Sequence, residues 1–276
     1  DVHEKETQWA RLMSSGSPLH RWRMATHFWC ARWFWPSPAT APNAAELRAL
    51  IDASVGNDGT LPRAHFERRV RELDAVVEDN RFFHWPLEFS DVFYEPDGRQ
   101  RAVPGFDAIV GNPPWEMLRQ EAHSPAPRTG RASPSSLVRF IRESELYPSC
   151  NRGHVNLYQP FVERALDLCR PGGRVGLIVP WGLAVDEGAA QLRRVLMERA
   201  ALSTVVGLDN ARGLFPIHRG VRFLAFVAAP GSATTDIRAR FGVKTSDELD
   251  ALPGEESPLE PSAYPLRLTA AHLRIV

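Results

Sequence analysis

The tetrapeptide Asn112-Pro113-Pro114-Trp115 places a carboxamide, two rigid residues and an aromatic ring side by side. Proline fixes φ and has no backbone N–H, so the carbonyl groups of this turn are left to accept hydrogen bonds. An amine on an aromatic ring or an amide is a poor nucleophile because its lone pair is delocalised. Two acceptors, the Asn112 side-chain oxygen and the Pro113 carbonyl, would bond both of its N–H groups and localise that lone pair. Trp115 would stack on the ring that carries the amine.

The position of the tetrapeptide in the chain favours this chemistry. Residues 106–111 have the pattern of a short apolar strand that ends directly before it. Ligands of open α/β sheets bind just beyond the carboxyl ends of the strands. A structural interpretation stays open, in which Asn-Pro-Pro is a rigid turn and Trp115 is a core aromatic.

The elements around the tetrapeptide alternate between strand and helix. This alternation is typical of an α/β fold with crossover helices. Gly172 and Gly173 follow a predicted helix and precede a predicted strand, the reverse of the phosphate-binding order, and so predict a helix C-cap. The predicted helices cover residues 157–169 and about 186–200, and the predicted strands cover residues 106–111, 174–180, 203–208 and 221–229.

The first 80 residues have a helical pattern instead. Trp22, Trp29 and Trp33 recur at helical spacing, and residues 64–77 form a second amphipathic stretch. Aromatic stripes of this kind usually bury their rings, so we expect them to form a core.

Two later stretches lack regular apolar periodicity. Residues 116–152 are rich in Pro, Ser and Arg and predict a long loop. After Pro230 the apolar pattern fades, which indicates a linker or the start of a new domain.

The composition is that of an ordinary globular protein, with 43% hydrophobic and 24% charged residues. The 33 basic and 33 acidic residues cancel, so bulk charge does not point to nucleic acid, although a local basic face can still bind phosphate. Cys30, Cys150 and Cys169 form no C-x-x-C pair and predict neither a zinc site nor a disulfide framework. No apolar run reaches membrane-spanning length, and isolated thiols suit a reducing compartment, so we expect a cytoplasmic protein.

Four sequence blocks together resemble a known family. Phe-Asp-Ala-Ile-Val-Gly-Asn-Pro-Pro-Trp at residues 106–115 resembles motif IV of the amino-methyltransferases that use S-adenosylmethionine. Residues 156–166 and 170–180 resemble motifs V and VI, and Leu-Phe-Pro at residues 214–216 resembles motif VIII. The order is similar to that of adenine-N6 DNA methyltransferases, including large restriction–modification and phage-defence enzymes. The similarity covers roughly residues 80–230.

The resemblance implies a fold, a reaction and a set of roles. The fold would be the C-terminal part of a Rossmann-like class I methyltransferase sheet, with a helical N-terminal segment. The reaction would transfer a methyl group from S-adenosylmethionine to the N6 amine of an adenine flipped out of duplex DNA. Asn112, Pro113, Pro114 and Trp115 would form the catalytic loop. Phe215 would stack on the flipped base opposite Trp115.

The resemblance also implies contacts with the cofactor and with DNA. Phe161 would pack on the adenine of the cofactor, Glu88 and Phe89 would lie beside that adenine, and Asn112 would face the cofactor as well as the base. Without the family, Phe161 is an ordinary apolar residue on a helix. Independently of the family, a basic loop just after the tetrapeptide could follow a DNA backbone, and the alternative of a solvated or disordered loop stays open. The arginines expected at the DNA backbone are Arg119, Arg128, Arg131, Arg212 and Arg219.

One block of the family is missing from the sequence. No F-x-G-x-G strand–turn–helix, which would cradle the methionine part of the cofactor, occurs upstream of residue 106. We therefore expect a fragment that binds S-adenosylmethionine poorly by itself. The expected domains are a helical insertion or linker at residues 1–80, a catalytic core lacking the first cofactor-binding strand at 81–230, and a linker or the start of a target-recognition region at 231–276.

Alternative functions remain open at this point. The same tetrapeptide serves methyltransferases that act on protein glutamine amides or on guanine amines of RNA. A non-catalytic DNA-binding or assembly subunit could also keep the fold after losing the cofactor block. The expected partners are double-stranded DNA and a fused or separate nuclease and target-recognition domain.

Overall fold

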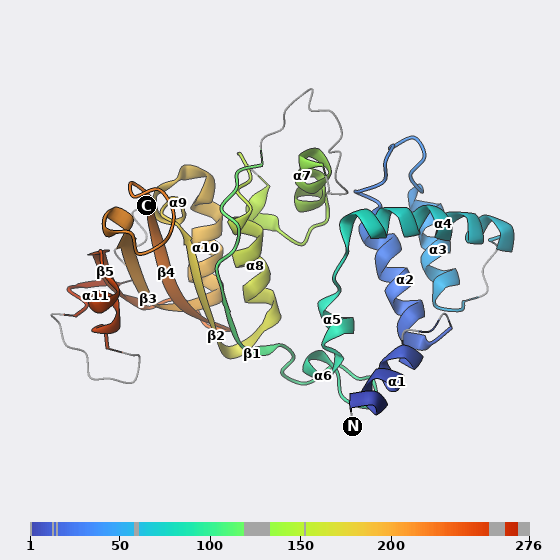
Figure 1. Ribbon diagram of the computed structural model, residues 1–276, viewed down its shortest axis with the longest axis horizontal. Helices are drawn as coiled ribbons and strands as arrows, with labels where there is room; N and C mark the ends of the chain where they lie inside the picture. The colour runs from blue at the N-terminus through green and yellow to red at the C-terminus, as the bar shows by residue number, and fades with distance from the viewer. Residues whose placement is uncertain are drawn as a thin grey trace. The chain divides into compact units, whose positions relative to one another are not determined.

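The computed structural model describes residues 2–12, 14, 16–57, 61–118, 133–151, 153–253 and 263–269. The chain divides into two compact units, drawn in Figure 1. The first unit comprises Asp1–Pro96 and Gln120–Phe140, and the second comprises Asp97–Arg119 and Ile141–Val276.

The first unit is helical, as the sequence predicts. Side-chain caps mark two helix starts, because the Ser17 hydroxyl accepts from the His20 N–H and the Asn43 carboxamide accepts from the Glu46 N–H. Its helices are α1 (Val2–Leu12), α2 (Pro18–Ala31), α3 (Ala44–Ser54), α4 (Arg63–Asn80), α5 (Trp85–Glu88) and α6 (Ser90–Phe93).

The core of the first unit lies between α2, α3 and α4. Phe28, Leu50 and Leu73 are each at most 1% exposed and belong to one cluster. The expectation of buried aromatics is confirmed for Trp33, which is 3% exposed, and is wrong for Trp22, which is 56% exposed. Trp22 is exposed because the buried face of α2 is formed by Ala25, Phe28 and Ala31, and Trp22 lies on a different face.

The prediction of a long loop at residues 116–152 is wrong for part of this segment. Residues 134–143 form helix α7 (Pro134–Glu143), and Pro148–Cys150 forms the short 3-10 helix η1. The Ser133 hydroxyl accepts from the Ser136 N–H at 3.1 Å, which caps the helix, and proline fits the first helical position. Val138 and Ile141 are buried. The Pro-Ser pair that suggested a loop is therefore a helix start.

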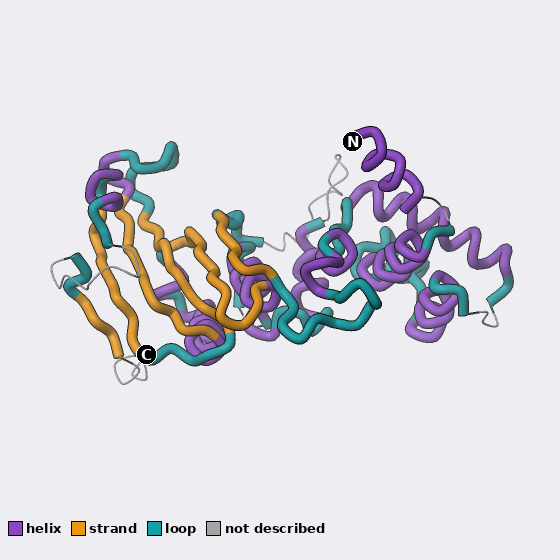
Figure 2. The backbone as a smooth tube through the Cα atoms, turned by 90° about the horizontal axis from the view of Figure 1, so that it is seen from below, coloured by secondary structure: helices purple, strands orange, loops and turns teal. Residues whose placement is uncertain are grey.

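The second unit contains a six-stranded sheet, whose strands run side by side in Figure 2. Their order is β1-β2-β4-β3-β5-β6. The strands are β1 (Phe106–Gly111), β2 (Cys169–Pro180), β3 (Ala200–Asp209), β4 (Arg222–Pro230), β5 (Asp236–Val243) and β6 (Leu266–Thr269). The predicted α/β class is confirmed, with every predicted strand present.

The strand directions bring three carboxyl ends to one edge of the sheet. β1 is parallel to β2, and β4 is antiparallel to both β2 and β3, so β1, β2 and β3 all point the same way. We call the edge where these three strands end, and where β4 begins, the C-terminal edge. It is the edge at which α/β sheets bind ligands.

Helices cover one face of this sheet. α8 (Tyr158–Leu168) and α10 (Ala190–Arg199) pack on β2 and β3 and share a core cluster with them. Val206, Leu208 and Phe223 belong to a separate cluster. Since strand side chains alternate between faces, Phe223 and its neighbour Leu224 point to opposite sides of the sheet. The remaining short elements are α9 (Gly182–Val185), η2 (Glu187–Ala189), η3 (Asn210–Arg212) and α11 (Ser246–Asp250).

Two further expectations differ from the structure. α8 ends at Leu168 and β2 begins at Cys169, so Gly172 and Gly173 lie in an irregularity of the strand and not in a helix C-cap. Gly172 has φ of 75°, and a Cβ on Gly173 would meet the Cys169 sulfur at 2.6 Å, so this irregularity requires glycine. The boundary expected after Pro230 falls inside the sheet, because β5 pairs with β3.

Candidate active site

The Asn112–Trp115 loop leaves the C-terminal edge directly from β1. Pro113 is buried, whereas Asn112 and Pro114 are exposed. Within the described part of the chain, the Asn112 carboxamide makes no hydrogen bond, so its oxygen is available to a ligand. Pro113 is therefore anchored in the protein, while Asn112 and Pro114 face solvent.

Trp115 is held by two strands of the sheet. Its indole N–H donates to the Ile178 carbonyl of β2 at 3.4 Å. Its ring lies against Phe223 of β4, with 5.6 Å between ring centroids and 41° between planes. Trp115 is half-buried, so one part of the ring is supported and another part is accessible.

Phe215 reaches the same support from the loop between β3 and β4. Its ring meets Phe223 edge-on, at 4.9 Å between centroids and 86° between planes. Phe223 is completely buried. The structure therefore brings the predicted pair Trp115 and Phe215 onto one shared ring. Sequence reasoning missed Phe223, because it lies inside an ordinary apolar strand run and nothing in that run distinguishes it.

The segment after Trp115 is fastened to the start of α8. The Leu157 N–H donates to the Glu116 carbonyl and the Leu118 N–H donates to the Val155 carbonyl, both at 2.9 Å. These bonds make a short antiparallel pairing between residues 116–118 and 155–157. Backbone hydrogen bonds thus connect the segment that follows the motif IV block to the start of the motif V block.

Phe161 lies one turn into α8 and is 51% exposed. The residues beside it, Tyr158 and Val162, are at most 2% exposed and belong to the core. Phe161 is therefore not a core residue, which leaves its ring available to a ligand.

Glu88 and Phe89 lie in the first unit. The Glu88 carboxylate pairs with the Arg23 guanidinium at 2.6 Å, and the Phe89 ring stacks on Trp85 at 5.7 Å and 19°. Their place beside a cofactor stays a prediction.

The structure describes two of the arginines that we expect to contact the DNA backbone. Arg212 and Arg219 are exposed in the β3–β4 loop, on either side of Phe215. Arg222, at the start of β4, is exposed at the same edge and was missed because it was read as part of the strand. Arg119, Arg128 and Arg131 lie outside the described residues.

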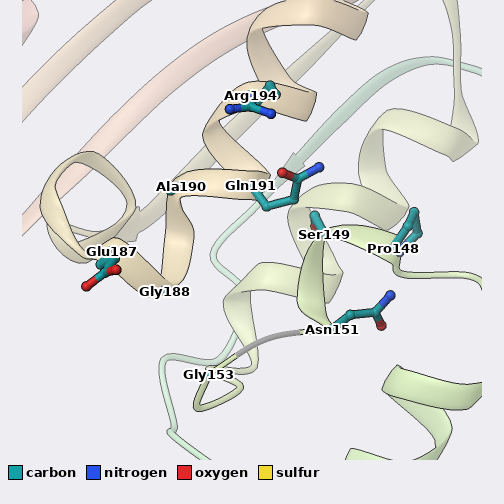
Figure 3. Close-up of a pocket in the computed structure, with 9 residues that line it drawn as sticks. All are labelled: Pro148, Ser149, Asn151, Gly153, Glu187, Gly188, Ala190, Gln191 and Arg194. Carbon is teal, nitrogen blue, oxygen red and sulfur yellow. The ribbon is translucent and has the colours of Figure 1, made fainter. Parts of the chain in front are cut away.

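A separate hollow of about 880 Å³ lies between η1 and the start of α10 (Figure 3). Beside it, the Ser149 hydroxyl donates to the buried Glu163 carboxylate. Burial raises the pKa of Cys150 to about 12, so this thiol stays protonated and is a poor nucleophile. The residues that line the hollow are Pro148, Ser149, Asn151, Gly153, Glu187, Gly188, Ala190, Gln191 and Arg194. None of the predicted site residues that the structure describes is among them.

Neither a metal-binding cluster nor a membrane span is present among the described residues. There, no cluster of three or more His, Cys, Asp or Glu side chains could bind a metal ion. None of the helices in the described part of the chain combines the length and apolar character that a membrane span requires.

Comparison with known families identifies the class of protein. The sequence model of the Eco57I restriction-modification methylases matches residues 29–215, which is more than half of the chain. The chain therefore belongs to the Eco57I restriction-modification methylase family.

Individual relatives are more distant. The Type II methyltransferase M.XhoI of Xanthomonas vasicola is 34% identical over 107 residues, which are 39% of this chain and 17% of that protein. The M protein of the type I restriction enzyme EcoKI matches 84% of this chain and 51% of its own, at 16% identity and a TM-score of 0.35. The type IIG restriction endonuclease BpuSI matches 82% of this chain and 26% of its own, at 15% identity and the same TM-score. The chain thus spans a minor part of the length of M.XhoI.

Proposed function

We propose that the protein methylates the N6 amine of adenine in duplex DNA, with S-adenosylmethionine as the methyl donor. The observation that carries this proposal is that the exposed Asn112 carboxamide belongs to the same loop as Trp115, whose ring shares the support of Phe223 with Phe215. Membership of a restriction-modification methylase family agrees with DNA as the substrate.

The chain's own residues would prepare the amine for attack. Asn112 Oδ1 and the Pro113 carbonyl would accept hydrogen bonds from the two N6–H groups and so localise the nitrogen lone pair. Trp115 and Phe215 hold the adenine once it has left the duplex. S-adenosylmethionine, when bound, supplies an electrophilic methyl carbon. Its thioether would be the leaving group of that methyl group, and the product ammonium at N6 would release its proton to water.

The residues present fit the adenine end of S-adenosylmethionine. Phe161 offers a half-exposed ring on α8, and α8 is joined to the catalytic loop through the bond between Leu157 and Glu116. Phe161 would stack on the cofactor's adenine and keep it beside Asn112. The cradle for the methionine end is the block that the sequence lacks before residue 106.

DNA contact would come from the loops of the C-terminal edge. Arg212 and Arg219 flank Phe215 and would bind backbone phosphates on either side of the flipped base. We propose Arg119, Arg128 and Arg131 for the same task on sequence grounds. A nuclease and a target-recognition domain, fused or separate, would supply cleavage and sequence choice.

The test is to identify the methylated base. Full-length protein is incubated with duplex DNA and S-adenosylmethionine labelled in the methyl group, and the DNA is digested to nucleosides. The expected result is label in N6-methyl-2′-deoxyadenosine, and loss of this nucleoside from host DNA when the gene is deleted. Label in cytosine would overturn the base assignment. Label in RNA or protein when these are supplied in place of DNA, or no transfer by a protein that still binds DNA, would favour the alternative functions.

A further inference from the structure

Asn210 is a buried polar residue at the C-terminal edge, directly after β3. Its side chain is 0% exposed. Its Oδ1 accepts from the Phe215 N–H at 2.9 Å. Its Nδ2 donates to the carbonyls of Phe215, Ile217 and His218 at 3.2, 3.1 and 3.3 Å. The oxygen and the nitrogen of this carboxamide therefore both form hydrogen bonds with the backbone of one loop.

These bonds organise the loop from inside. A side-chain amide has two hydrogens, so three carbonyls share them. The Asn210 backbone adds two bonds, one to the Val221 carbonyl at 3.2 Å and one from the Gly213 N–H at 2.8 Å. Gly213 has φ of 77°, which lets the chain reverse here. The loop thus closes around a single side chain.

Phe215 is the residue most tightly bound by this arrangement. Both its N–H and its carbonyl bond to Asn210, and its ring packs on Phe223. We propose that Asn210 is a positioning residue that holds Phe215 ready to stack on the target base. This inference rests on the proposed function, since it needs Phe215 to contact the base. Such pre-organisation means that binding does not have to order the loop.

The chemistry of the site requires a carboxamide. An aspartate at position 210 would keep the acceptor for the Phe215 N–H but would face three carbonyls without a donor. An alanine would leave all these backbone groups without their buried partner. We therefore expect the loop to lose order when Asn210 is replaced, even if the sheet remains folded.

The test compares Asn210→Ala with Thr234→Val. Thr234 is also buried, and its hydroxyl donates to the Ala200 carbonyl at 2.7 Å and accepts from the Leu202 N–H at 2.9 Å, at the opposite end of β3. Both variants lose buried hydrogen bonds to the backbone, so both are expected to lower thermal stability. Only Asn210→Ala disturbs the loop that carries Phe215.

Three measurements on the full-length protein decide the proposal. Hydrogen exchange of the Phe215 amide should accelerate in Asn210→Ala and stay slow in Thr234→Val. The kcat/KM for methylation should fall by roughly 10- to 100-fold in Asn210→Ala, the range expected for one lost aromatic stack, and stay within about twofold in Thr234→Val. With 2-aminopurine at the mapped methylation position, emission in Asn210→Ala should match that in Phe215→Ala.

The Phe215→Ala background separates positioning from a general effect. If Asn210 acts through Phe215, adding Asn210→Ala to Phe215→Ala should change kcat/KM by less than about twofold. Fully additive losses, or unchanged exchange at Phe215, would overturn the proposal. If the wild type methylates no adenine, the proposed function fails, and the exchange measurement still decides whether Asn210 orders the loop. If Asn210→Ala does not fold, Asn210→Ser, which keeps one hydrogen-bonding group, takes its place in the same comparison.

Discussion

The two units of this chain both depend on aromatic side chains, but they use them differently. In the first unit, Phe28 and Trp33 are buried and pack on other rings of the same unit. In the second unit, Trp115 and Phe215 are only half-buried, and the fully buried Phe223 supports both. Rings in the first unit build a core, whereas these two rings in the second unit border a strand end.

Polar groups show the same contrast. In the first unit, the Glu46 carboxylate bonds to Arg69 and His65, and His84 bonds to His27. In the second, the Asn112 carboxamide stands in solvent without a bond to any described residue. Buried polar groups need a protein partner, while an exposed group beside supported rings can serve a ligand. The polar groups of the first set are therefore bound within the protein, which agrees with the proposed role of Asn112 and gives no such role to Glu46 or His84.

The largest effect is expected for Asn112→Ala. Removing one of the two acceptors for the amine should lower methyl transfer at least roughly 100-fold, by analogy with the loss of one catalytic hydrogen-bond partner. Because Asn112 is exposed, the free energy of unfolding should change by less than about 0.5 kcal/mol. Labelled methyl incorporation into DNA measures the first quantity and thermal unfolding the second.

Asn151→Ala is the matched control for this prediction, since Asn151 is an exposed asparagine that lines the hollow of Figure 3. It should retain normal activity. Equal activity of Asn112→Ala and wild type would remove Asn112 from the proposed site.

A smaller loss is expected when a stacking ring is removed. Trp115→Ala should lower kcat/KM by roughly 10- to 100-fold, because one aromatic face of the base pocket is lost. Trp22→Ala is the control from the first unit, where Trp22 is 56% exposed. Its kcat/KM should stay within about twofold of the wild type. A similar loss in both variants would break the contrast between the two units.

The first unit should weaken in acid. Burial, with Arg23 nearby, lowers the pKa of His27 and of His84 from 6.5 to about 4. The folded unit then binds fewer protons than the unfolded chain between these values. The stability that neutral histidines provide is present above pH 6.5 and is lost as pH falls toward 4. Hydrogen exchange of the α2 amides at pH 7 and pH 5, corrected for intrinsic rates, measures this.

The double variant His27→Asn, His84→Asn keeps polar side chains that do not titrate. Its α2 stability should depend less on pH than that of the wild type. An equal dependence would show that other groups cause the acid effect.

The stability of the second unit should change with pH in the opposite direction to that of the first unit, and this is the smallest of the expected effects. Burial raises the pKa of Glu163, and hydrogen bonds from Ser149 oppose this in part. A raised pKa gives a stability contribution that is fully present below the unfolded pKa and is lost as pH rises through the folded pKa. Lowering the pH should therefore relieve part of the cost of burying this carboxylate. Exchange of α8 amides measures the effect, and Glu163→Gln should abolish it.

Local pattern predicted much of the second unit and part of the first. β1, α4 and α8 follow from apolar periodicity, and the place of the Asn112–Trp115 loop directly after β1 made it the predicted site. Helix α7 was missed because Ser133 and Pro134 are loop signals and helix-start signals alike, and only the burial of Val138 and Ile141 separates the two. The strand beyond Pro230 was missed because pairing with β3 stabilises it more than its own weak pattern indicates.

By itself, the sequence predicted the chemistry of the Asn112–Trp115 loop, because a carboxamide, two prolines and an indole stand in four consecutive residues. It also determined the helical and α/β character of the two parts, since that depends on short-range periodicity. Only the tertiary structure decided that Phe223 joins Trp115 to Phe215, and that Asn210 bonds to the β3–β4 loop that carries Phe215. The ring contacts with Trp115 link residues about a hundred positions apart, and the roles of Phe223 and Asn210 depend on burial, which no local pattern records.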